Sequence, residues 1–171
     1  MNTDNIDVFK QTVNDGCRNV ILQICGLQVL HGEITQCSTQ YCNADIAVII
    51  GIFGEFRGQV YFTLKMPLAL KLASHVIGEP QSTIADELFK SALSELCNII
   101  MGNIVGSLYK IGIELDITPP TVLTSENIWF SGDKLGITSD KMEIYKFTFT
   151  IIDDEDMCVC VALPTSLLQR K

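Results

Sequence analysis

Apolar residues recur at helical spacing in three stretches of the chain, which cover residues 6–26, 68–77 and 86–111. Gly26 and Gly78 close the first two stretches, and Pro67 stands where the first turn of the second would lie. Before the third stretch, Thr83 followed by Asp86 resembles a capping box in its acidic form. The pattern predicts two long helices with a short helix between them.

Segments with strand character lie before the second helix and after the third, at residues 31–39, 44–53, 59–65, 145–152 and 157–163. In the third of them, Val60, Phe62 and Leu64 take alternate positions, and we expect them to face the core. Tyr61 and Thr63 lie between them, so we expect these two side chains to face outward. This order of elements predicts an α+β fold (mixed α/β), in which helices pack on an antiparallel sheet.

An internal duplication is indicated by two fragments with the same spacing, Phe9-Lys10 followed by Cys17 and Phe89-Lys90 followed by Cys97. In this register Asp15 corresponds to Glu95, and Arg18 corresponds to Asn98. We therefore expect a degenerate duplication within one domain that covers residues 1–171.

Composition narrows the class of protein. The net charge of −8 argues against a nucleic-acid partner, because phosphate backbones are bound by Lys and Arg. The polar, acidic start of the chain does not resemble a signal peptide. Gly102 and Gly106 form a G-x-x-x-G spacing, but Glu95, Asn98 and Asn103 interrupt the apolar run around it. We therefore expect a cytoplasmic protein without membrane insertion, and close packing or a kink at the two glycines.

The seven cysteines do not form a recognisable metal or disulfide pattern. Their number is odd, no C-x-x-C occurs, and His31 and His75 are the only histidines. We expect reduced thiols that pack as small apolar groups, and no metal site in this chain.

The third helix has a polar face that could carry chemistry. Because successive residues of a helix rotate by about 100°, Ser91, Glu95, Asn98 and Gly102 fall within about 60° of one another. Ser91 has no base in the local motif, so a serine hydrolase is a weak interpretation. A carboxylate and an amide could instead dock a partner and position a water molecule for attack on phosphorus. From the spacing alone, however, a solvated helix face is the more common explanation.

Residues 85–122 resemble the CheC–CheX–FliY family of chemotaxis phosphatases. The family signature is Asp or Ser, three residues, Glu, two residues, Asn, and a proline after a spacer. Here it reads Ser91, Glu95, Asn98 and Pro120. Residues 116–122 are similar to CheX in particular.

The resemblance implies a phosphatase that removes the aspartyl phosphate of a CheY-type response regulator. Asn98 would orient the attacking water, and Glu95 would pair with an active-site lysine of the regulator. Ser91 and Gly102 would contact the partner, and Pro120 would fix the backbone. Mg²⁺ would belong to the regulator, and this chain would need no cofactor of its own.

Two further expectations follow from the resemblance. Arg18 stands where a second active helix would carry its asparagine, so one active helix per chain is expected. CheX proteins are homodimers joined through their sheets, so a homodimer is expected here.

Two alternatives remain open from the sequence. The same helix could bind a response regulator or a flagellar switch component without catalysis. A small-molecule sensor domain would instead require a large apolar pocket.

Overall fold

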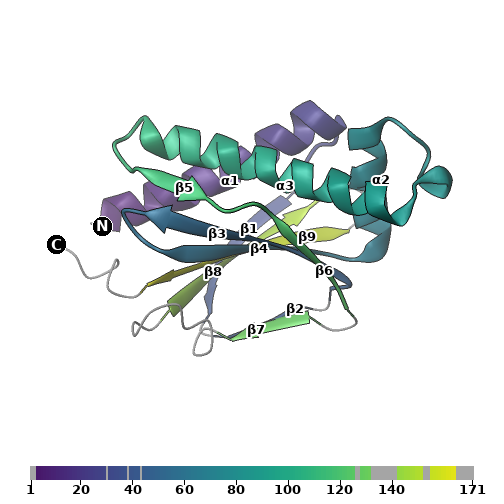
Figure 1. Cartoon of the computed structure of the whole chain (residues 1–171). Helices are drawn as coiled ribbons and strands as arrows, with labels where there is room; N and C mark the ends of the chain where they lie inside the picture. The colour runs from purple at the N-terminus through teal and green to yellow at the C-terminus, as the bar shows by residue number, and fades with distance from the viewer. Residues whose placement is uncertain are drawn as a thin grey trace.

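The fold has two main layers, with three helices packed on one face of an antiparallel sheet (Figure 1). The computed structural model describes residues 3–29, 31–37, 39–42, 44–125, 128–131, 142–151 and 155–164. The helices are α1 (Thr3–Cys25), α2 (Met66–Ile77) and α3 (Asp86–Tyr109), with a short 3₁₀ turn η1 (Gln81–Thr83) before α3. The predicted α+β class is confirmed, and each predicted helix lies within a few residues of its expected position.

The described strands are β1 (His31–Cys37), β2 (Thr39–Cys42), β3 (Ile46–Gly54), β4 (Gly58–Leu64), β5 (Leu115–Ile117), β6 (Thr121–Thr124), β7 (Ile128–Ser131), β8 (Met142–Thr150) and β9 (Asp156–Pro164). The main sheet has the order β1-β8-β9-β4-β3-β5, and β6 also pairs with β3. Strands β2 and β7 form a separate ribbon. Part of the predicted acidic turn, residues 152–154, lies outside the described residues.

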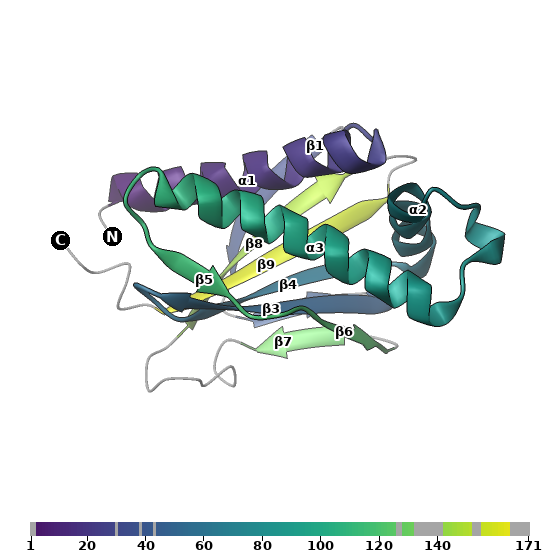
Figure 2. The same cartoon turned by 45° about the horizontal axis from the view of Figure 1, so that its top comes forward.

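The topology supports the internal duplication. The first half of the chain has the order α1, β1, β2, β3, β4, and the second half has α3, β5 and β6, β7, β8, β9. Corresponding strands take equivalent places: β1 pairs with β8, β5 and β6 pair with β3, and β4 pairs with β9 at the centre. The two long helices run side by side in opposite directions over the same face of the sheet (Figure 2).

Close approach of α1 and α3 depends on Gly16. A Cβ atom at this position would lie 2.5 Å from Cγ1 of Ile104, so only glycine fits without movement.

Cys17 and Cys97 are buried in the core, and burial raises the pKa of both thiols. Burial also raises the pKa of Cys25 to about 11. These three thiols therefore stay protonated and pack as small apolar groups, as expected from the sequence.

The expectation for strand β4 was half wrong. Val60, Phe62 and Leu64 face the helical layer, but Tyr61 and Thr63 are only 2% exposed as well. Tyr61 belongs to a second apolar cluster, which also contains Ala44, Met142, Ile144, Cys160 and Ala162. The β2–β7 ribbon lies on this side of the sheet (Figure 1). Alternation shows which residues share a face, but it does not show whether another layer covers that face.

Two expectations for α3 also need correction. The helix begins after Ala85, which makes no side-chain cap, and Thr83 belongs to the preceding 3₁₀ turn. Asp86 and Glu87 supply negative charge in the first turn instead.

Gly102 and Gly106 are not close-packed: both are exposed, and a Cβ atom on either would meet nothing within 4 Å. The helix also continues without interruption through both positions.

By length and composition alone, α3 could cross a membrane, with a mean hydropathy of 1.2. Its apolar side chains have another explanation in this fold. Phe89, Leu93, Leu96, Ile100 and Ile104 are buried in the core between the helices and the sheet. This is the usual composition of a core helix.

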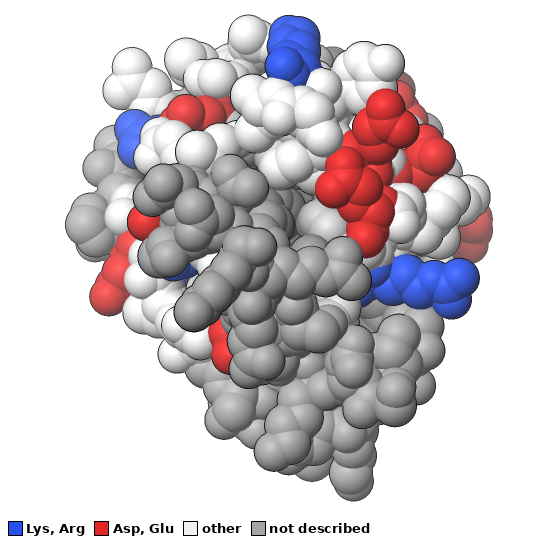
Figure 3. All heavy atoms as spheres, turned by 90° about the vertical axis from the view of Figure 1, so that its left-hand side faces the viewer, with Lys and Arg blue, Asp and Glu red and all other residues white. Residues whose placement is uncertain are grey.

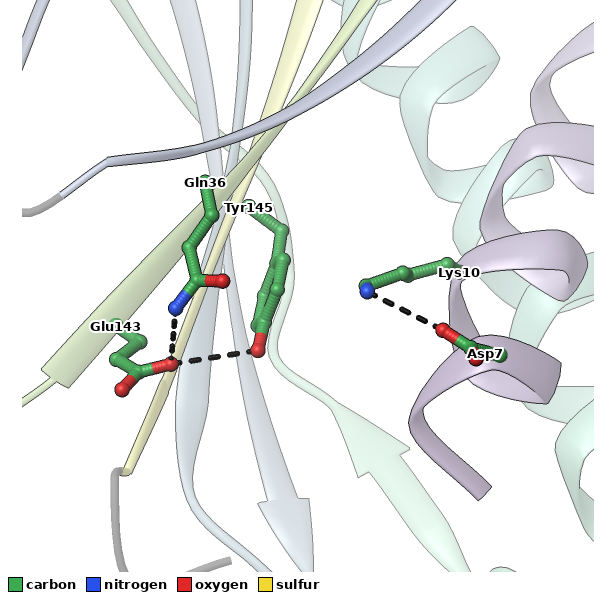
Figure 4. Close-up of polar contacts among 5 residues, drawn as sticks. All are labelled: Asp7, Lys10, Gln36, Glu143 and Tyr145. Atoms are coloured by element: carbon green, nitrogen blue, oxygen red, sulfur yellow. Dashed lines mark hydrogen bonds and ion pairs between the residues drawn. The ribbon is translucent and has the colours of Figure 1, made fainter. Parts of the chain in front are cut away.

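A cluster of polar side chains links the first turns of α1 to the sheet (Figure 4). Lys10 Nζ lies 3.3 Å from Asp7 Oδ1 and 5.1 Å from the centre of the Tyr145 ring. The Tyr145 hydroxyl donates to Glu143 Oε2 at 3.3 Å, and Gln36 Nε2 donates to the same oxygen at 2.7 Å. Burial, followed by the charge of Glu143, raises the pKa of Tyr145 to about 12. The group therefore joins α1, β1 and β8 through a neutral tyrosine.

Candidate functional site

The outer face of α3 is polar because its inner face supplies the core. Ser91, Glu95 and Gly102 are exposed, and Asn98 is half-buried. Leu93, Leu96 and Ile100 point the opposite way and are buried. The helical geometry predicted from the sequence is confirmed: the four residues form one row along the surface of the helix.

Pro120 joins this row from a different part of the chain. An open hollow of about 310 Å³ is lined by Glu87, Lys90, Ser91, Ser94, Glu95, Asn98 and Pro120. The structure thus brings together all four residues of the sequence signature. We call this hollow, between α3 and the segment that joins β5 to β6, the first hollow.

An irregularity in strand pairing precedes Pro120. Strand β5 ends opposite Ile52, and β6 begins opposite Ile49, so two residues of β3 face three residues, 118–120. Thr118 anchors this extra length: its N–H donates to the Gly51 carbonyl at 3.0 Å, and its Oγ1 accepts the Gly51 N–H at 2.9 Å. The two prolines that follow have no N–H, so they suit an interrupted edge strand. A bulge of this kind re-aims side chains beside the helix face.

The polar groups of the row are available to a partner. Within the described part of the chain, the side chains of Ser91, Glu95 and Asn98 make no hydrogen bond or ion pair. Lys90, the cation of the first hollow, is held by its own helix at 2.5 Å from Asp86 and 4.0 Å from Glu87. Its hydrogen bond to Asp86 raises the pKa of Lys90. Among the described residues, no cation therefore pairs with the carboxylate of Glu95.

Metal chemistry finds no support in the described residues, where no group of three or more His, Cys, Asp or Glu side chains could hold an ion. His75 lies in the last turn of α2, and it does not line either of the hollows on α3. The arrangement offers an amide and a carboxylate on a rigid helix. Such groups can position a water molecule and a partner.

A second hollow, of about 470 Å³, continues from the first along α3. Its lining residues are Asn98, Ile99, Gly102, Asn103, Gly106, Ser107 and Lys110. Asn98 belongs to both hollows and marks their boundary. Among these residues, the sequence indicated only Asn98 and Gly102 as functional. The available signal was the four-residue spacing of Asn98, Gly102 and Gly106, which places them in one row.

The two glycines have no evident role in the fold. Gly102 and Gly106 are exposed, meet nothing at the Cβ position and are not among the described glycines with positive φ. Glycine in an exposed helix interior costs about 1 kcal/mol relative to alanine. Alanine would therefore stabilise α3 at either position.

The corresponding face of α1 differs at the positions that match Glu95 and Asn98. Asp15 accepts a hydrogen bond from Gln11 at 2.9 Å, and Arg18 is exposed in the place that matches Asn98. Arginine has donors but no acceptor, so it cannot orient a water molecule as an amide does. The face of α1 therefore lacks the group that makes α3 a candidate site.

The charge distribution at one end of the molecule is distinctly acidic. Figure 3 shows a group of acidic side chains on this face, with basic side chains scattered singly around it. Glu55, Glu114 and Asp116 are exposed where β3 ends and β5 begins, and Glu55 Oε1 accepts the Glu114 N–H at 3.0 Å. An acidic surface of this kind does not suit a nucleic-acid backbone.

Comparison with known proteins gives the family. The family model "Chemotaxis phosphatase CheX" matches residues 46–135. The CheY-P phosphatase CheX of Thermotoga maritima is 30% identical over 136 residues, which cover 80% of this chain and 83% of that protein. A CheC-like superfamily protein from Shewanella sp. PV-4 has the same fold, with a TM-score of 0.74, 20% identity, and coverage of 95% of this chain and 98% of that chain.

A further similar fold comes from a complex. The CheX–CheY–BeF₃–Mg²⁺ complex from Borrelia burgdorferi matches with a TM-score of 0.66 and 22% identity, over 91% of this chain and 97% of that chain. The family match covers more than half of the chain and includes β3, β4, α2, α3 and Pro120. The chain therefore belongs to the CheX family of chemotaxis phosphatases and is a hydrolase.

Proposed function

We propose that this protein removes the phosphoryl group from the aspartyl phosphate of a CheY-type response regulator. The observation that carries the proposal is the row of Glu95 and Asn98, unpaired among the described residues and open to solvent beside Pro120. The Thermotoga relative is named for the same reaction, at 30% identity. The protein would act in the cytoplasm, where response regulators work.

Asn98 is the residue to which we assign the chemistry. Its carboxamide oxygen would accept a hydrogen bond from a water molecule and direct the water oxygen at phosphorus. The new P–O bond forms as the bond to the aspartate oxygen breaks, which gives inorganic phosphate and the regulator's free carboxylate. Phosphoryl transfer requires mainly positioning and charge stabilisation, so an amide on a rigid helix suffices.

Glu95 would orient the regulator rather than react. Its carboxylate lies one helical turn before Asn98 and has no cation of its own chain as partner among the described residues. A lysine beside the phosphorylated aspartate would pair with it and thereby fix the distance between Asn98 and phosphorus. Ser91 and Gly102 would be contact positions at the two ends of the row. Any Mg²⁺ would belong to the regulator, and the Borrelia complex contains this ion together with CheY.

A phosphate-release assay with a phosphorylated response regulator tests the proposal. The wild type should accelerate the loss of phosphate, and Asn98→Ala should remove most of the acceleration while binding persists. Asn19→Ala, at an exposed position of α1, is the matched control and should behave as the wild type. Equal rates for Asn98→Ala and the wild type would contradict the assigned role. Binding without any acceleration by the wild type would favour a non-catalytic regulator-binding module.

We further propose a homodimer joined through the β1 edge. Among the described strands β1 pairs only with β8, and its residues 32–36 are exposed, with Ile34 41% exposed. An edge strand of this length can pair with a second copy. The β3, β5 and β6 strands beside the candidate site lie at the opposite edge, so both active faces would remain free. Sedimentation analysis of Ile34→Lys should then show a shift from dimer toward monomer.

A further inference from the structure

The second hollow has the position expected for the other half of the regulator's docking surface. Asn98 lines both hollows, so a regulator whose phosphoryl group lies over Asn98 meets the boundary between them. A stable interface covers about 800 Å² on each partner, which corresponds to a disc with a radius of about 16 Å. At about 1.5 Å per residue, Gly102 lies about 6 Å and Gly106 about 12 Å beyond Asn98 along the axis. Both glycines thus fall within such a footprint, and the backbone of Lys110, about 18 Å beyond Asn98, lies just outside its rim.

The surface of the second hollow fits a protein that approaches the helix backbone closely. Gly102 and Gly106 have no side chain, and a Cβ atom at either position would project into open space. Asn103 Nδ2 donates to the Ile99 carbonyl at 3.1 Å, which ties that side chain to its own helix. The two glycines therefore keep the hollow open, although the packing of the fold does not require small residues there.

The two ends of the docking surface carry opposite charges. Glu95 lies in the first hollow, and Lys110 lies at the far end of the second, about 22 Å along the helix. Lys110 is exposed and makes no ion pair with any residue that the structure describes. A protein with a basic group near its phosphoryl aspartate and an acidic group farther away would match this polarity.

We propose that the second hollow docks the phosphorylated response regulator, with Gly102 and Gly106 setting how closely its surface approaches α3 and Lys110 pairing with an acidic residue. This inference rests on the proposed function, because it takes the regulator as the partner. It assigns Gly106, Ser107 and Lys110 to recognition, in addition to the residues of the signature. A side chain at position 106 would hold the regulator away from Asn98.

The test compares Gly106→Ala and Gly106→Leu with the control Gln23→Leu, which adds the same side chain to the exposed surface of α1. Gly106→Ala should raise the melting temperature and raise KM for the phosphorylated regulator about threefold. Gly106→Leu should raise KM tenfold or more, with a smaller change in kcat, and Gln23→Leu should change neither constant. Lys110→Glu should raise KM at low salt, and the effect should shrink at high salt.

Two outcomes separate this inference from the proposed function. If the wild type accelerates phosphate loss and both Gly106→Leu and Lys110→Glu keep KM within twofold of the wild type, the docking role is wrong. If the wild type does not accelerate phosphate loss, the proposed function fails, and equilibrium binding still tests the hollow. The probe is then the regulator loaded with beryllofluoride and Mg²⁺, for which Gly106→Leu must weaken Kd tenfold or more. Unchanged Kd in that measurement overturns the inference.

Discussion

Pro120 and Asn98 line the same hollow, although Pro120 follows β5 and Asn98 lies in the middle of α3. The helix supplies the polar groups, and the irregular edge strand supplies one wall of the hollow. Thr118 fixes the second feature to β3, because its paired hydrogen bonds to Gly51 hold the start of the segment that carries Pro120. The site is therefore composite, and its shape depends on β3 as well as on α3.

Thr118→Val should weaken this wall. The change preserves the shape of the side chain but removes the oxygen that accepts the Gly51 N–H at 2.9 Å. We expect a loss of about 1 kcal/mol in the free energy of unfolding and a several-fold fall in kcat/KM as Pro120 shifts. Urea unfolding and the phosphate-release assay measure the two effects.

The matched control is Thr121→Val, on an exposed position of β6 whose side chain makes no hydrogen bond with the described residues. This variant should retain both stability and activity. If Thr118→Val also retains full activity, the position of Pro120 does not depend on this anchor.

Glu95→Gln should weaken docking more than chemistry. The substitution keeps the size of the side chain and removes the charge that we assign to a lysine of the regulator. Loss of one partner of an intermolecular charge pair raises KM, here by about tenfold at low salt, and the difference should shrink as salt increases. Steady-state kinetics at two ionic strengths measure this.

Glu79→Gln, at an exposed position just after the end of α2, removes the same charge outside the row on α3 and serves as the control. It leaves the overall charge equal to that of Glu95→Gln, so a general electrostatic effect would appear in both variants. Equal KM values for the two would assign the effect to net charge rather than to docking.

The elements that could be predicted from the sequence are those with a strong internal period. The face of α3 that carries Ser91, Glu95 and Asn98 follows from helical rotation alone, because buried leucines mark the opposite side. The hairpin strands β8 and β9 are likewise long and apolar, and they were predicted close to their observed positions. The pairing of the two halves agrees with the spacing of Cys17 and Cys97, although that spacing could not give the strand order.

The features that were missed depend on contacts distant in sequence. Strands β5, β6 and β7 have only three or four residues each, too few for alternation to be recognised. Tyr61 was expected to face outward because its pattern does not reveal the second apolar cluster that buries it. The second hollow was missed because a glycine pair at positions 102 and 106 is equally typical of close packing, and only the structure shows open space there.

Asp45 should give stability a measurable pH dependence. Its Oδ2 accepts the Met66 N–H at 2.9 Å at the start of α2, and its Oδ1 lies 3.1 Å from Lys65 Nζ. The Met66 N–H, followed by the Lys65 side chain, holds the pKa of Asp45 below its usual range. The stabilisation is thus present above the unfolded pKa of about 3.9 and is lost as the pH falls through the lower folded pKa.

Asp45→Asn should therefore cost about 0.5–1 kcal/mol at pH 7, a small value because both side chains are at least one-third exposed. The difference from the wild type should narrow below about pH 4. Urea unfolding at pH 7 and pH 3 measures it. Asp116→Asn, at an exposed position without an ion pair to the described residues, should show no comparable change between the two pH values.

Two helical glycines should respond to alanine with opposite signs. Gly106→Ala adds a methyl group to open space, so the gain in helix propensity should stabilise the protein by about 1 kcal/mol. Gly16→Ala would place its Cβ 2.5 Å from Cγ1 of Ile104, and overpacking of this kind costs about 1–3 kcal/mol. This cost equals or exceeds the gain in helix propensity of about 1 kcal/mol. We therefore expect Gly16→Ala to lower the melting temperature.

A double-mutant cycle with Ile104 tests whether the α1–α3 contact causes the destabilisation by Gly16→Ala. Ile104→Val removes only the terminal methyl and keeps Cγ1, whereas Ile104→Ala removes the atoms that the new Cβ would meet. Both single changes at Ile104 are destabilising, because the side chain is 2% exposed. In the Ile104→Ala background, however, Gly16→Ala should become neutral or stabilising, while it stays destabilising beside Ile104→Val. An unchanged penalty in the alanine background would place the cost of Gly16→Ala elsewhere than in the approach of the two helices.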